Sequence, residues 1–141
     1  MLRTILPSLL IFYVLSPVFA NAEAGANQRV VHYDPSITEI SGILERQTFP
    51  GPPNYESIQN GDDMERGWYL MLDHSIDVVA LAIPNSNDES ERNVKVMQIV
   101  VMNDDHEKVL RSTPSGAQLT IRGTLFHRLT GHHHSRVLVE V

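Results

Sequence analysis

The chain has 141 residues, of which 17 are acidic and 11 basic, giving a formal net charge of −6 with neutral histidines. This length suits one domain of ordinary size. An acidic surface repels phosphate backbones, which excludes DNA and RNA as expected partners. The chain has no cysteine, so thiol chemistry and disulfides are excluded and the core alone must stabilise the fold.

The first residues have the pattern of a secretory signal peptide. Arg3 gives a positive start, residues 5–19 are mostly apolar, and residues 20–22 (ANA) fit the small-x-small cleavage pattern. An uncleaved membrane anchor is the alternative, but the run is shorter than the roughly 20 apolar residues of a spanning helix. We therefore expect removal of residues 1–22, no stable membrane insertion afterwards, and a periplasmic or secreted protein with a flexible leader at 23–28.

The hydrophobic pattern beyond the leader predicts mainly strands. In 36–49 the apolar spacing also fits a helix, but the β-branched residues favour a strand. A change of spacing at Gly42 predicts a β-bulge or a tight bend. Residues His74 and Ser75 are predicted to form a tight connection between two strands. The predicted strands are 29–34, 36–49, 67–73, 76–83 and 94–102.

A short helix and a hairpin are predicted at the end of the chain. Asn103 or Asp104 can cap a helix that ends at about Arg111. Alternating apolar residues in 118–125 and 137–141 then predict a closing hairpin. If its tip is 128–131, His127 and His132 face each other and His132 shares a strand face with His134.

This order of elements predicts an all-β fold with one short helix, an OB-fold-like Greek-key barrel of five to six strands formed by residues 29–141. A β-sandwich is the alternative. OB folds bind ligands between the loops that join strands 1–2 and 4–5. In this chain those loops correspond to 49–66 and 127–135, which hold most of the unusual residues.

The first of these loops combines stiffness with aromatic side chains. Residues 50–54 (PGPPN) hold three prolines and are flanked by Phe49 and Tyr55, and rigid aromatic rings suit recognition of a partner. The alternative for Tyr55 is that it only closes the open end of the barrel. Trp68 and Tyr69 lie on opposite faces of one strand, and Trp68 is expected in the core. The expected binding surface comprises Phe49, Asn54, Tyr55, Glu56 and Tyr69.

Four histidines near the C-terminus predict a second kind of site. Imidazole nitrogens bind Zn²⁺ or Cu²⁺ at about 2 Å. The alternative is a solvated, pH-sensitive hairpin tip, in which case no metal cofactor is required. The candidate metal ligands are His127, His132 and His134 of the tip with Asp62 and Asp63 of the other loop.

Two segments of the chain carry a family resemblance. Residues 50–57 (PGPPNYES) and 130–134 (TGHHH), with WYLMLD between them, resemble DUF4431, a bacterial family without an assigned activity. The resemblance spans about 33–141. It implies a small exported protein with one domain, and it implies no catalytic or binding residue.

The chain departs from this resemblance in its cysteines. Many members of the family carry one cysteine near the start of the domain and another in the strand after the LD pair. Here Val31 or His32 and Asp77 occupy the corresponding places. The disulfide that the resemblance implies is therefore lost, and the pairing of the first strand with the third is no longer secured by a covalent bond.

We therefore expect an exported, non-enzymatic binding module that recognises a protein or cell-envelope partner through residues 49–66 and 127–135. An immunity protein that neutralises an exported toxin is one such module. A transition-metal binding protein using the histidine tip is the alternative. A hydrolase comes third, because the sequence holds no GxSxG or HExxH motif and no phosphate-binding loop.

Overall fold

The computed structural model describes residues 28–83 and 88–141. The predicted signal peptide and all of the predicted leader except Gln28 lie outside these residues. Within the described part of the chain, the helices are too short or too polar to cross a membrane.

Six strands and one α-helix form the described part of the chain. A single 3-10 turn, η1, precedes the third strand. Their bounds are β1 Arg29–His32, β2 Ile37–Pro50, η1 Ile58–Asn60, β3 Met64–Val79, β4 Glu91–Val100, α1 Asp104–Ser112, β5 Gln118–His127 and β6 Val137–Glu140.

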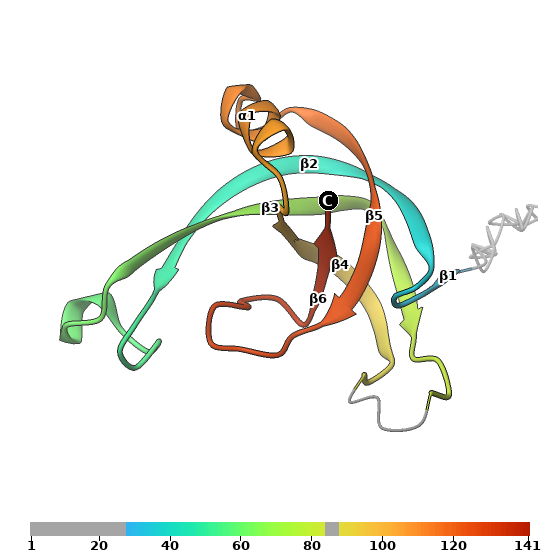
Figure 1. Ribbon diagram of the computed structural model, residues 1–141, viewed down its shortest axis with the longest axis horizontal. Helices are drawn as coiled ribbons and strands as arrows, with labels where there is room; N and C mark the ends of the chain where they lie inside the picture. Colours follow the sequence, from blue (N-terminus) through green and yellow to red (C-terminus); the bar gives the residue numbers. More distant parts are fainter. Residues whose placement is uncertain (1–27, 84–87) are drawn as a thin grey trace, which may run out of the picture.

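The strands form one sheet that closes on itself. Its order is β1-β3-β2-β5-β6-β4, and a further pairing of β3 with β4 completes the ring. Within the ring only β4 and β6 are parallel. The helix α1 follows the third strand of the ring, as Figure 1 shows. This connectivity confirms the predicted OB-fold-like barrel and excludes the sandwich.

The strand β2 changes its partner at Gly42. Its first half pairs with β5 up to Ile43, and its second half pairs with β3 from Gly42 onwards. A Cβ atom on Gly42 would lie 2.3 Å from the carbonyl oxygen of Met71, so only glycine permits this approach. Neither pairing shifts its register at Gly42, and β2 arches smoothly over the barrel in Figure 1. The strand prediction is confirmed, and the bulge is absent.

The two strands predicted at 67–73 and 76–83 are a single strand, β3. Met71 pairs with Val96 and Ile76 pairs with Val94, so the intervening residues of β3 bulge away from β4. The predicted tight connection at His74 and Ser75 is therefore wrong. The reason is that the second half of β3 keeps a partner of its own: β1 pairs with it in parallel, without any disulfide.

The core contains apolar residues from every strand. Leu44, Leu70, Met97, Leu125 and Val139 are fully buried at its centre. Burying a side chain of this size contributes about 1.5–3 kcal/mol to the stability of the fold. Trp68, expected in the core, is partly buried and packs against the core, while Tyr69 is buried as well.

The predicted helix is confirmed as α1, with Asn103 as its N-cap. The Asn103 side chain accepts a hydrogen bond from the His106 amide at 2.9 Å, as expected of this capping residue. The closing hairpin has a longer tip than predicted, because His127 pairs with Val137. His132 therefore lies in the connecting loop and does not face His127.

Candidate functional site

The two loops singled out in the sequence meet at one end of the barrel. We call residues 49–66 and 127–135 the loop pair. The first loop is organised around the buried carboxylate of Asp62, which accepts hydrogen bonds from the amides of Asn54, Glu56 and Ser57 at 2.8–2.9 Å. The Asn54 side chain donates a further bond at 3.1 Å. Asp62 thus fixes the turn that carries Tyr55.

Hydrogen bonding also sets the charge state of Asp62. The amides of Ser57 and Glu56 lower the pKa of this carboxyl, burial opposes them, and Asn54 lowers it further. The net result is a pKa below the usual value, so Asp62 is ionised at neutral pH. All of these partners belong to its own loop, which identifies Asp62 as a structural residue. Asp63 beside it is exposed.

Tyr55 connects the first loop to the second. Its backbone has φ +60°, a left-handed conformation that is uncommon for a tyrosine. Its ring packs on Gly131, where an added Cβ atom would lie 3.0 Å from the ring carbons. Its hydroxyl lies 2.9 Å from Nε2 of His132. Both loops therefore hold Tyr55 in place.

Glu65 of β3 joins two of the predicted histidines. One carboxylate oxygen accepts a hydrogen bond from Nδ1 of His132, and the other lies 3.1 Å from Nε2 of His134. When His132 is neutral, donation from Nδ1 to Glu65 leaves its Nε2 to accept the Tyr55 hydroxyl proton, and when His132 is protonated Nε2 donates to the hydroxyl oxygen. Burial by itself would raise the pKa of Glu65, but the hydrogen bonds and charges of His134 and His132 outweigh it and lower the pKa.

Aromatic stacking and Gln98 of β4 complete the junction. The rings of Phe49 and His134 are stacked, with centroids 4.4 Å apart and planes 7° from parallel. The Phe49 ring also packs against the Tyr69 ring, with centroids 5.2 Å apart. The Gln98 side chain accepts from the His134 amide at 2.7 Å and donates to the His132 carbonyl at 3.0 Å. Residues 132–134 are therefore fixed on both sides.

Tyr69 is not part of the exposed surface. It is 2% exposed, and its hydroxyl has no hydrogen-bond partner among the described residues. Burial and the charge of Glu65 raise the pKa of this phenol. The alternative that Tyr69 is a buried core residue is confirmed. Its ring packs against the Phe49 ring.

His133 has a separate role within the tip loop. Its Nδ1 accepts hydrogen bonds from the amides of Leu129 and Thr130 at 2.9 and 3.3 Å, and its ring meets Phe126 edge-on at 5.3 Å. Burial, together with the nearby charges of His132 and His134, lowers the pKa of His133. The neutral ring is the form that this loop requires.

His127 lies in a different cluster. Its Nε2 lies 3.2 Å from Oε1 of Glu91, and Nη1 of Arg136 donates to Oε2 of the same carboxylate at 3.2 Å. Glu89, Glu91 and His127 place one ligand atom each within 4.8 Å of the others, and they are the only such group of three among the described residues. The five metal ligands proposed from the sequence therefore do not gather at one point.

The outer side of the loop pair is apolar in several places. The side chains of Leu129, Met64 and Ile58 are 70%, 57% and 39% exposed. Leu129 also lines an open depression of about 540 Å³, together with Tyr55, Arg128, Thr130, Gly131, His133 and His134. Asn54 and Glu56 are exposed along the same loop. This surface combines a fixed interior with exposed apolar side chains.

No local sequence pattern indicates two of the residues that hold this surface together. Glu65 is one of several acidic residues in a polar stretch, and Gln98 is one polar residue in an apolar strand. Their roles depend on contacts between strands far apart in the chain. Glu65, His132 and Tyr55 follow one another as carboxylate, imidazole and hydroxyl, the order of groups in hydrolase triads. Here the hydroxyl belongs to a phenol whose ring packs on Gly131.

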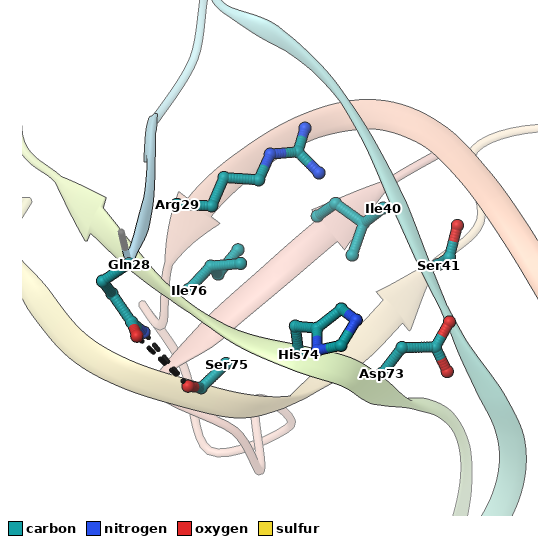
Figure 2. A pocket seen from close by; sticks show the side chains of 8 residues that line it. All are labelled: Gln28, Arg29, Ile40, Ser41, Asp73, His74, Ser75 and Ile76. Carbon is teal, nitrogen blue, oxygen red and sulfur yellow. Dashed lines mark hydrogen bonds between the residues drawn. The ribbon is translucent and has the colours of Figure 1, made fainter. Parts of the chain in front are cut away.

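A larger pocket of about 670 Å³ lies elsewhere on the barrel, between β1, β2 and the bulged part of β3. Figure 2 shows Gln28 reaching Ser75, with His74 and Asp73 following one another along the bulge. Asp73 accepts a hydrogen bond from Gln118 at 2.6 Å. This pocket contains none of the residues predicted to bind a partner or a metal.

The fold and the loop pair together define a small OB-fold-like barrel with a preorganised surface at one end. Residues 96–141 match the family model DUF4431, a domain of unknown function. This match confirms the resemblance to DUF4431 over those residues, which include the TGHHH segment, whereas PGPPNYES precedes them. No curated protein and no solved structure matches the chain.

Proposed function

We propose that this chain is an exported, non-enzymatic binding module that recognises a protein or cell-envelope component through the loop pair. The observation that supports the proposal is the joining of the two loops by Tyr55, His132 and Glu65, on loops that also expose large apolar side chains. Rigid loops lose little conformational entropy on binding, so more of the contact energy contributes to affinity.

The exposed side chains indicate what such a partner would contact. Leu129 lines the depression, and Met64 and Ile58 expose further apolar side chains on the other loop. An exposed apolar side chain with polar residues around it can anchor a protein partner. Tyr55 and His134 at the edge of the depression add aromatic and polar contacts. A protein partner with an apolar anchor fits this combination better than a purely polar ligand does.

Charge adds a constraint on the partner. The chain carries a net charge of −6, and complementary charge accelerates association. A basic protein would therefore be attracted before contact. An exported toxin with a basic surface is one such partner, in which case this chain would act as its immunity protein.

The experiment that tests the proposal is site-specific photo-crosslinking in bacteria that produce the protein. A photoreactive amino acid replaces Leu129 in one variant and Val109 of α1, which is 58% exposed, in the control. We expect a discrete protein adduct from position 129 and none from position 109. Equal adducts from both positions, or none from 129, would contradict the proposal.

Metal binding is the second candidate function, favoured by the approach of Glu89, Glu91 and His127. A free Zn²⁺ or Cu²⁺ concentration of about 100 times the dissociation constant of the site would raise the unfolding free energy by about 2.7 kcal/mol. The shift would fall at low pH, where protons compete for the ligand atoms. The variant His127→Ala would remove a shift arising at this cluster, and joint replacement of His132 and His134 would remove one arising at the tip.

A further inference from the structure

A second surface lies on the other face of the β2–β3 ribbon. Along a strand, successive side chains point to opposite faces, so Arg66 and Trp68 lie on one face and Glu65 and Tyr69 on the other. The cross-strand pairs are Arg46 with Trp68 and Thr48 with Arg66. Between this face and the end of α1 is a pocket of about 560 Å³, lined by Arg46, Gln47, Thr48, Arg66, Gly67, Trp68 and Arg111.

The lining of this pocket is basic in an acidic protein. Three of the chain's 11 basic residues line it, and no acidic residue does. The acids beside it already have partners, since Glu107 binds Arg111 at 2.9 Å and Glu45 accepts from Ser115 at 3.0 Å. The pocket therefore concentrates positive charge that the overall composition conceals.

Two of the arginines are held in place by the protein. Arg46 donates from Nη2 to the carbonyls of Leu110, Arg111 and Thr113 at the end of α1, at 3.2, 2.9 and 3.0 Å. The guanidinium of Arg111 lies 5.8 Å from the centre of the Trp68 ring, a cation–π distance. These two contacts fix the charge and the indole at the pocket wall.

Arg66 differs from the other two. Its side chain is exposed and has no hydrogen bond or ion pair with any described residue. Its five donors are therefore available to a ligand, and a guanidinium suits the bidentate binding of phosphate or carboxylate. Beside it, the partly buried Trp68 offers a flat apolar surface.

We propose that this pocket binds a small anion, a phosphate or carboxylate, that carries a planar group. Arg66 contacts the anionic group, and Trp68 contacts the planar group. Arg46 supplies a fixed positive charge beside it, whereas the charge of Arg111 is balanced by Glu107. Arg66 is the last residue of the 49–66 segment, but its side chain lies on the face opposite Tyr69 and Glu65, so the pocket is separate from the Tyr55–His132–Glu65 junction.

The test uses Trp68 as its own reporter, since it is the only tryptophan of the chain. Phenyl phosphate is titrated into the full-length protein, and Trp68 fluorescence is recorded with inorganic phosphate and phenol as separate probes. We expect a saturable change with phenyl phosphate at a Kd of about 1 mM or below, weaker binding of inorganic phosphate and no saturable binding of phenol.

Variants separate this site from a general effect of charge. Arg66→Ala should weaken phenyl phosphate binding about tenfold, the loss of one charge-assisted hydrogen bond. Arg122→Ala, an exposed arginine of β5, serves as the control and should bind as the parent does. No saturable change, equal binding by Arg66→Ala and Arg122→Ala, or equal affinity for all three probes would overturn the proposal. Thermal melting of both variants verifies that they are folded.

Discussion

Tyr55 and His132 are 77 positions apart in the chain, yet the Tyr55 hydroxyl lies 2.9 Å from Nε2 of His132. The two rings meet edge-on, with centroids 5.1 Å apart. This contact joins the proline-rich loop to the histidine-rich loop. The two segments that carry the family resemblance thus form one structural unit.

The first prediction concerns this hydrogen bond. Tyr55→Phe keeps the ring on Gly131 but removes the hydroxyl, so it should lower the unfolding free energy by about 0.5–1.5 kcal/mol. Urea denaturation of Tyr55→Phe, His132→Ala and the double variant measures the coupling between the two residues. Strictly additive effects would show that the hydrogen bond contributes nothing to stability.

The second prediction concerns the space beneath Tyr55. A Cβ atom at position 131 would lie 3.0 Å from the Tyr55 ring, and Tyr55 is also bound to His132. Gly131→Ala should therefore destabilise the fold by about 1–3 kcal/mol, the usual cost of overpacking. In a Tyr55→Ala background the same change should cost much less. An equal cost in both backgrounds would contradict the packing described above.

The third prediction concerns acid stability and Asp62. Its pKa is lower in the folded protein, chiefly through the amides of Ser57 and Glu56. A lowered carboxyl pKa contributes stability above the unfolded value of about 3.9, and this contribution is lost as pH falls further. Asp62→Asn should lower the denaturation midpoint at pH 7 and reduce its dependence on pH below 4. Asp63→Asn, the exposed neighbour, is the control, and equal behaviour of the two variants would contradict the prediction.

The fourth prediction concerns His133. Burial and neighbouring charges lower its pKa in the folded protein, where the neutral ring accepts bonds from two amides. Protons therefore bind more readily to the unfolded tip, and the loop loses stability as pH falls below about 6.5. Hydrogen exchange should show less protection of the Leu129 and Thr130 amides at pH 5.5 than at pH 7.5. In His133→Ala this difference in protection should disappear, and its persistence would contradict the role of the ring.

Much of the fold was predictable because its signals are local. Alternating residues predicted β4 and β5, and the Asn103 cap predicted the start of α1. The break at His74 was misread because a polar interruption resembles a turn. The continuation of β3 depends on its pairing with β1, which no local pattern reports.

The candidate site was predictable only in outline. Turn residues and aromatic rings indicated both loops, but the expected facing of His127 and His132 was wrong because the hairpin has another register. With His127 paired to Val137, His132 and His134 reach Glu65, and His127 reaches Glu91. Tyr69 was assigned to the exposed surface although it is buried, because the Phe49 ring that packs on it comes from the neighbouring strand β2.

The most direct test of the account is the affinity of the crosslinked partner for purified variants. Leu129→Asp replaces the most exposed apolar side chain of the loop pair, and Val109→Asp makes the same change on α1. We predict that Leu129→Asp weakens binding about thirtyfold, a hot-spot effect of about 2 kcal/mol, and that Val109→Asp leaves it unchanged. Equal affinities of the two variants would show that the loop pair is not the recognition surface.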